Sequence, residues 1–111
     1  MSHVAADTHR TLGPSDAIAN DHVAPYYLDD RKLRVTVARV DDRLYAFDDL
    51  CTCGGAPCPL SGGLLEGTSL MCQCHGSRFD ITTGAVINGP AINALNVYDV
   101  DVVEGNIRIR A

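Results

Sequence analysis

Hydrophobic and polar residues alternate along the chain from residue 33 to residue 38, where the sequence reads LRVTVA. This period of two, in a run rich in β-branched residues, predicts a β-strand. Asp41 and Asp42 then supply turn chemistry. The segment LYAF at 44–47 therefore predicts the returning arm of a β-hairpin.

The C-terminal end of the chain shows the same alternation twice. Residues 97–103 read VYDVDVV, residues 104–106 form the turn sequence EGN, and residues 107–110 read IRIR. No helical period of hydrophobic residues is sustained over three turns anywhere in the sequence. The pattern therefore predicts an all-β domain, built as a small barrel or sandwich.

Two segments lack such a pattern. Residues 1–21 are polar, and we expect a leader there that is loosely ordered or packed on the surface, the alternative being a plain tail. Residues 51–90 are filled with glycine, proline and cysteine, which indicates an irregular insertion that carries a functional site. The sequence thus predicts one domain at 22–111, with the inserted subdomain at about 50–91.

Composition and charge exclude several classes of function. The chain has 111 residues, a formal net charge of −5 and no basic stripe, which argues against nucleic-acid binding. No apolar run is long enough to span a membrane, and the first residues lack the apolar stretch of a secretory signal, so we expect a cytoplasmic protein. A small acidic domain is suited to docking onto a basic patch of a larger partner.

The five cysteines supply the candidate chemistry. In a cytoplasmic protein they indicate metal ligands or redox groups before a disulfide framework. The short clusters CTC and CQCH offer four candidate ligands, Cys51, Cys53, Cys72 and His75. Because thiolates and imidazole suit zinc or iron–sulfur chemistry rather than calcium or magnesium, these clusters predict a protein that carries a metal centre.

Further motifs surround these clusters in a fixed order. PLSGG stands at 59–63, CQCHGSRFD at 72–80, TG at 83–84 and NGPA at 88–91. Together they resemble the Rieske [2Fe–2S] ferredoxins, which carry Cys-x-His in one loop, then Cys-x-x-His, Gly-Ser and an aromatic residue in a second. The resemblance covers the chain except for the leader. It implies an antiparallel β-sandwich or barrel with an inserted, loop-rich cluster-binding subdomain, and a [2Fe–2S] cluster as cofactor.

The resemblance also implies the role of each ligand. Cys51 and Cys72 match the two cysteines that hold the inner iron, and His75 matches the second histidine, on the outer iron. Cys53 occupies the position of the first histidine, so a centre that it ligates would be Cys3His1 rather than Cys2His2. The alternative is that Cys53 is a spare thiol beside a vacant or degenerate site.

The two remaining cysteines match a disulfide found in some members of this family. Cys58 begins a CPLS motif at 58–61, and Cys74 precedes the ligand histidine. The resemblance therefore implies a Cys58–Cys74 bridge that joins the two loops. In the rival assignment, Cys58 is the ligand and Cys53 is spare.

Residues around the centre predict a low reduction potential. A third thiolate adds negative charge and stabilises the oxidised state. We therefore expect a reduction potential between that of Rieske centres, at about −150 to +300 mV, and that of all-cysteine plant-type centres, at about −400 mV. The resemblance implies that Ser77 donates a hydrogen bond to the cluster, unless it is an ordinary loop hydroxyl. The resemblance also implies that Phe79 stands where high-potential members of the family carry a donating tyrosine. Leu60, Phe79 and Pro90 are expected to exclude water by packing.

The resemblance implies a one-electron carrier between a flavin-containing, NAD(P)H-dependent reductase and an oxygenase or other terminal oxidoreductase. We expect such a component to have no catalytic activity alone, because no nucleophile–base pair or open metal position is evident. Two alternatives stay open. One is a structural zinc module that uses the same Cys3His set, and the other is an iron–sulfur sensor or cluster-transfer protein.

Overall fold

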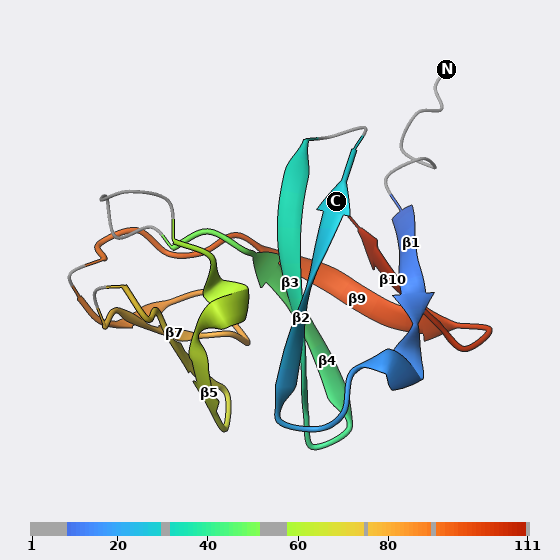
Figure 1. The fold of residues 1–111 in the computed structure, drawn as a ribbon, viewed down its shortest axis with the longest axis horizontal. Helices are drawn as coiled ribbons and strands as arrows, with labels where there is room; N and C mark the ends of the chain where they lie inside the picture. Colours follow the sequence, from blue (N-terminus) through green and yellow to red (C-terminus); the bar gives the residue numbers. More distant parts are fainter. Residues whose placement is uncertain (1–8, 30–31, 52–57, 75, 90, 111) are drawn as a thin grey trace.

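The computed structural model describes residues 9–29, 32–51, 58–74, 76–89 and 91–110, which form two antiparallel sheets (Figure 1). The strands and 3₁₀ helices are, in chain order, β1 (His9–Pro14), η2 (Ser15–Ala17), β2 (His22–Leu28), β3 (Leu33–Val40), β4 (Arg43–Asp48), η3 (Leu60–Gly62), β5 (Leu64–Glu66), β6 (Ser69–Met71), β7 (Arg78–Asp80), β8 (Val86–Asn88), β9 (Val97–Val103) and β10 (Asn106–Arg110). No α-helix occurs among these residues, which confirms the all-β prediction. None of the helices in this part of the chain is long and apolar enough to cross a membrane.

The larger sheet has six strands in the order β1-β10-β9-β4-β3-β2. Its β3–β4 hairpin is the one predicted from the alternating pattern, with Val37 opposite Ala46. The turn residues Asp41 and Asp42 have φ values of 51° and 65°, as a tight two-residue hairpin turn requires. The hairpin of β9 and β10 is likewise confirmed, with Ile109 opposite Val100.

The two faces of the β3–β4 hairpin contact two different hydrophobic cores. Val35 and Val37 pack in one core with residues of β10 such as Ile109, inside the curled larger sheet. Ala38 and Phe47 belong to the other core, which lies between this sheet and the cysteine-bearing segment. This double role explains why β3 is buried on both faces although its sequence alternates.

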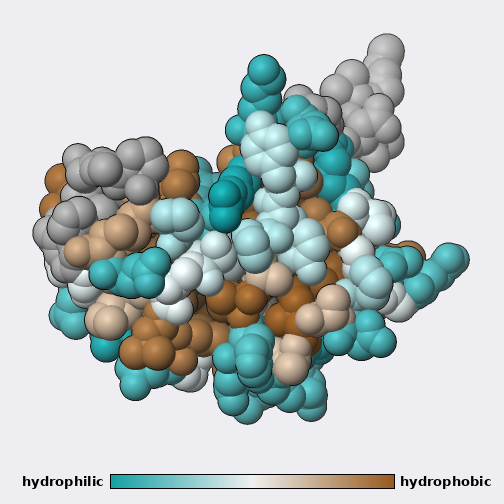
Figure 2. Space-filling view, in the orientation of Figure 1, coloured by the Kyte–Doolittle hydropathy of each residue, from teal (hydrophilic) through white to brown (hydrophobic). Residues whose placement is uncertain are grey.

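The cysteine-bearing segment contains a second sheet, with the order β5-β6-β7-β8, which lies to the left of the larger sheet in Figure 1. The sequence predicted only an irregular, loop-rich insertion here, and that prediction missed all four strands. Each has three residues, too few for a period of two to stand out. Figure 2 shows hydrophobic patches near this smaller sheet, where Leu64 of β5 is 52% exposed.

The N-terminal segment corrects another expectation. A loosely ordered leader was expected at residues 1–21, but β1 pairs with β10 and Ile18 is buried. The Arg39 guanidinium further donates hydrogen bonds to the carbonyl oxygens of Ser15 and Ile18, each at 2.7 Å. The expectation of loose order is therefore wrong from residue 9 onward, and residues 1–8 lie outside the described part. The partner strand of β1 is distant in sequence, so no local pattern indicated the pairing.

Candidate metal centre

Two loops carry the predicted ligands, and backbone hydrogen bonds hold the described ends of each. In the first loop, the Cys51 N–H donates to the Cys58 carbonyl at 3.0 Å, and Leu50 pairs with Pro59 in an isolated bridge. The residues between, 52–57, lie outside the described part, and Cys53 is one of them.

The second loop follows β6 and returns into β7. The Cys72 N–H donates to the Ser77 carbonyl at 2.7 Å, and the Gly76 N–H donates to the Cys72 carbonyl at 2.9 Å. Gly76 has a φ of 78°, a value that glycine adopts without strain. His75, the predicted ligand in this loop, lies outside the described residues.

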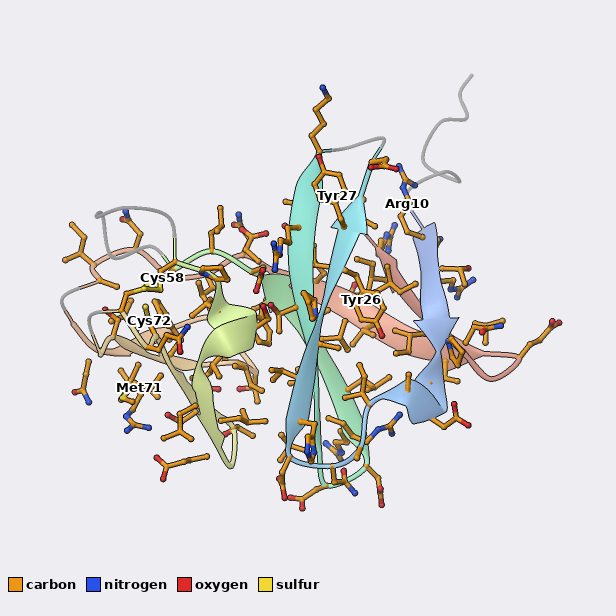
Figure 3. All side chains as sticks on the ribbon, viewed as in Figure 1. Arg10, Tyr26, Tyr27, Cys58, Met71 and Cys72 are labelled. Atoms are coloured by element: carbon orange, nitrogen blue, oxygen red, sulfur yellow. A yellow bond between two sulfur atoms is a disulfide. The ribbon has the colours of Figure 1, made fainter. Side chains whose placement is uncertain are left out.

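The sulfur atoms of three cysteines lie together where these loops meet. Cys58 and Cys74 form a disulfide with a Cα–Cα distance of 6.3 Å. The Sγ atom of Cys72 lies 3.4 Å from the Sγ atom of Cys58. All three sulfurs lie within 4.8 Å of one another, and Figure 3 shows Cys58 and Cys72 side by side near η3. The structure thus contains the disulfide that the family resemblance implied, and it leaves Cys58 without a thiolate for the rival ligand assignment.

Cys51 and Cys72 are the described cysteines outside this disulfide. Cys72 is fully buried, in the same hydrophobic core as Leu60 and Phe79, and Cys51 is partly buried and packs against that core. Soft thiolates in a site from which water is excluded suit an iron–sulfur or zinc group. These two residues therefore fit the predicted centre. The ligand roles of Cys53 and His75 stay predictions.

The other residues predicted around the centre are buried where they are described. Ser77 is fully buried, and its hydroxyl oxygen accepts a hydrogen bond from the Ala91 N–H at 3.0 Å. Because a hydroxyl has one donor besides its lone pairs, Ser77 retains a hydrogen that it can donate. This bond also ties the second loop to Ala91 and the segment that follows it. Pro90 lies outside the described residues.

Asp49, a fully buried carboxylate just before the first loop, is a functional candidate that no sequence motif indicated. Its Oδ1 atom accepts hydrogen bonds from the Thr36 hydroxyl at 2.5 Å and from the Ser61 N–H at 2.7 Å. Its carboxylate also forms an ion pair with Arg34, and its carbonyl oxygen accepts a bond from the Leu60 N–H. A period of two places residue 49 on the same face as the buried Phe47, and this was the available signal.

Gly63 follows η3 and allows the first loop to approach the smaller sheet. A Cβ atom at this position would lie 2.3 Å from the carbonyl oxygen of Met71, in β6. No side chain fits so close to a backbone atom, so only glycine allows this approach of the two segments.

Known proteins are similar to this chain in sequence and in fold. The model of the Rieske [2Fe–2S] domain family matches residues 9–99. Ferredoxin CarAc of Metapseudomonas resinovorans is 39% identical over 75 residues, which are 68% of each chain. The ferredoxin subunit of anthranilate 1,2-dioxygenase of Burkholderia cepacia is 32% identical over 98 residues, which cover 88% of this chain and 87% of that protein.

Solved structures agree with these sequence matches. The ferredoxin of Sphingomonas yanoikuyae B1 has a TM-score of 0.84 at 27% identity, and the match covers 92% of this chain and 97% of that one. A chain from the complex of reduced oxygenase and oxidized ferredoxin in carbazole 1,9a-dioxygenase has a TM-score of 0.82 at 26% identity, with 93% of both chains covered. The predicted sandwich or barrel with an inserted subdomain is thereby confirmed.

Proposed function

The chain belongs to the Rieske [2Fe–2S] domain family, and on that premise we propose that it is a one-electron carrier of an oxygenase system. The observation that carries the proposal is the convergence of two loops on the buried Cys72, within the fold of dioxygenase ferredoxins. The [2Fe–2S] cluster of this family supplies reversible uptake of one electron. The domain itself holds the cluster, shields it and presents it to partners.

We assign the ligands as Cys51 and Cys72 on the inner iron, with His75 and Cys53 on the outer iron. Cys72 presents its sulfur inside a hydrophobic core that excludes water. The neighbours of His75 in the chain, Cys74 and Gly76, are both exposed. This exposure supports electron exit through the second loop, since a short path to a partner needs a ligand near the surface.

The proposed Cys3His1 set makes this carrier more reducing than a Cys2His2 Rieske centre. The additional thiolate favours the oxidised state, and Phe79 has no hydroxyl that could donate to a cluster sulfur. We therefore place the midpoint potential between about −400 and −150 mV, the values of all-cysteine and Rieske centres that bracket it. A midpoint above about 0 mV would contradict this ligand set.

The proposed partners are a flavin-containing NAD(P)H-dependent reductase and a terminal oxygenase. Several relatives are ferredoxin components of dioxygenase systems, and a structural relative is a ferredoxin bound to its oxygenase. In each cycle the reductase supplies one electron to the oxidised carrier, which then passes it to the oxygenase. The net charge of −5 suits docking onto basic surfaces of both partners. The cytoplasmic location expected from the sequence stays a prediction.

Electron paramagnetic resonance (EPR) of the reduced protein, with metal analysis, tests the proposal on the wild type and on Cys53→His. We expect about two irons per chain in both proteins and a red-brown colour. The substitution should convert the spectrum into that of a Cys2His2 Rieske centre and raise the midpoint potential, because an imidazole replaces a thiolate.

Two results would contradict parts of this proposal and are distinguishable. A Rieske spectrum in the wild type that Cys53→His leaves unchanged would show that Cys53 is not a ligand, while electron transfer would stand. A colourless wild-type protein with one zinc per chain would instead support a structural metal module. Cys53→Ser is the matched control, since it removes the thiol without providing an imidazole.

A further inference from the structure

The Asp49 carboxylate joins three parts of the chain that meet at the first cysteine loop. The Thr36 hydroxyl, from β3, and the Ser61 N–H, from η3, both donate to its Oδ1 atom. Asp49 itself directly follows β4 and stands two residues before Cys51. One side chain therefore connects the larger sheet to both ends of this loop.

Backbone bonds reinforce this junction. The Asp49 N–H donates to the Arg34 carbonyl at 3.0 Å, and the Asp49 carbonyl accepts from the Leu60 N–H. A buried carboxylate is costly unless it is hydrogen-bonded and paired. The Oδ1 atom accepts both side-chain-directed hydrogen bonds, whereas the Oδ2 atom has no hydrogen-bond partner and is held by the ion pair with Arg34 alone. Loss of the side chain would leave the Thr36 hydroxyl and the Ser61 amide without this acceptor.

The ion pair at this junction is asymmetric in its exposure. The Asp49 side chain is fully buried, whereas the Arg34 side chain is 47% exposed. Solvent screens the positive partner more strongly than the buried negative one. The pair therefore leaves a net negative field on the loop that carries Cys51.

We propose that Asp49 is a positioning residue of the metal centre: it ties the two ends of the first cysteine loop to the larger sheet, and its charge favours the oxidised cluster. This inference rests on the proposed function, because it concerns the loop of a proposed ligand. Neither the sequence motifs nor the predicted ligand set includes this residue.

The test uses the loaded protein with Asp49→Ala, Asp49→Asn and the matched control Asp48→Asn. Asp48 is a neighbouring carboxylate that accepts bonds from Tyr98 and Asn96, on the β9 side of the sheet. Two quantities are measured for each variant: the rate at which a chelator removes the metal, and the midpoint potential.

Asp49→Ala should lose its metal about tenfold faster than the wild type or more, because buried donors are left unsatisfied. Asp49→Asn retains an acceptor oxygen for Thr36 and Ser61, so its loss rate should stay close to that of the wild type. Its midpoint potential should nevertheless rise, and by more than in Asp48→Asn. Thr36→Val, which removes a single donor, provides a milder variant if Asp49→Ala does not fold.

Equal rates of metal loss in the wild type, Asp49→Ala and Thr36→Val would overturn the positioning role. A midpoint in Asp49→Asn no higher than in Asp48→Asn would overturn the effect of the charge. A wild-type protein that holds zinc would overturn the proposed electron transfer. In that case the rate of metal loss from Asp49→Ala, relative to that from the wild type, would still decide whether Asp49 positions the loop.

Discussion

The two sheets of this domain are stabilised in different ways. Strands of the larger sheet reach eight residues in β3 and seven in β9, and their alternating side chains build a hydrophobic core that includes no residue of the smaller sheet. The second core is shared, because residues of β3 and β4 pack there against residues of the cysteine-bearing segment. Strands of the smaller sheet have three residues each, and the loops beside them depend on single contacts. Among these are the Cys58–Cys74 disulfide and the bonds of Asp49 and Ser77. Distributed packing therefore supports the scaffold, whereas a few specific groups define the metal centre.

The largest expected effect is the complete loss of the metal centre while the larger sheet stays folded. Cys72→Ser should abolish cluster binding, because a serine hydroxyl is a poor substitute for a buried thiolate on iron. The larger sheet should stay folded, since its other core, with Val37 and Ile109, does not include Cys72. Visible absorption and EPR would measure the cluster, and far-ultraviolet circular dichroism would measure the strands.

Gln73→Ser is the control for Cys72→Ser, because Gln73 is the exposed neighbour in the same loop. It should retain the full cluster content. A Cys72→Ser protein that still shows the wild-type EPR spectrum would remove Cys72 from the ligand set.

The second prediction tests the core that both regions share. Phe47 is fully buried in β4 and packs in the hydrophobic core that contains Leu60, Leu70 and Phe79. Phe47→Ala should lower the free energy of unfolding by about 3–5 kcal/mol through lost burial and a cavity. Urea unfolding of the loaded protein would measure this, and cluster loss should coincide with loss of the strands.

Tyr27→Ala is a suitable comparison, since that aromatic side chain is 58% exposed. It should change the free energy of unfolding by no more than about 0.5 kcal/mol. If Phe47→Ala released the cluster while the larger sheet unfolded at its usual urea concentration, the two regions would not share one cooperative core.

The third prediction concerns the disulfide that joins the loops. Cys58 and Cys74 are separated by 16 residues, and a closed loop of this size contributes about 3 kcal/mol in the chain-entropy model. A Cys58→Ala, Cys74→Ala double variant should therefore be less stable and release its cluster faster. Unfolding with and without reductant would measure the effect: the reductant should weaken the wild type and leave the double variant unchanged.

Sequence reasoning succeeded best where the chain repeats a pattern. The hairpin of β3 and β4 and that of β9 and β10 followed from alternation and turn residues, because each strand pairs with its neighbour in the chain. β1 was missed since its edge pairing depends on β10, at the opposite end of the sequence. The strands of the smaller sheet were missed because three residues do not establish a period.

The metal centre was predictable for a different reason. The residue types at Cys51 and Cys72 indicated soft-metal chemistry, and family motifs, not spacing, implied the pairing of Cys58 with Cys74. The sequence did not indicate a role for Asp49, because two adjacent aspartates are typical of a solvent-exposed turn. Its role depends on Thr36 and Ser61, which only the folded chain brings together.

A smaller effect is expected from the hydrogen bonding around the centre. Phe79 is fully buried, opposite Leu70 in the neighbouring strand, and the family resemblance implies that it stands in the position of a hydrogen-bond-donating tyrosine. Phe79→Tyr should raise the midpoint potential by about 40 mV, since one added hydrogen bond is worth about 1 kcal/mol for a one-electron couple. Voltammetry would measure the shift, with Phe79→Leu as the control that adds no donor. An unchanged midpoint in Phe79→Tyr would mean that residue 79 does not reach the cluster sulfurs.

The smallest expected effect concerns an ion pair on the surface of the larger sheet, outside the cysteine-bearing segment. The Arg108 guanidinium donates two hydrogen bonds to the Asp101 carboxylate, at 2.9 and 3.2 Å, and this lowers the pKa of that carboxyl. A lowered pKa in the folded state stabilises the protein at pH values above the pKa of the unfolded state, about 3.9, and this gain is lost as the pH falls through the pKa of the folded state. Asp101→Asn should thus unfold at a slightly lower urea concentration than the wild type at pH 7, and the difference should vanish in strong acid and shrink in high salt. A difference as large as that caused by Phe47→Ala would show that the larger sheet, like the metal centre, depends on single polar contacts rather than on distributed packing.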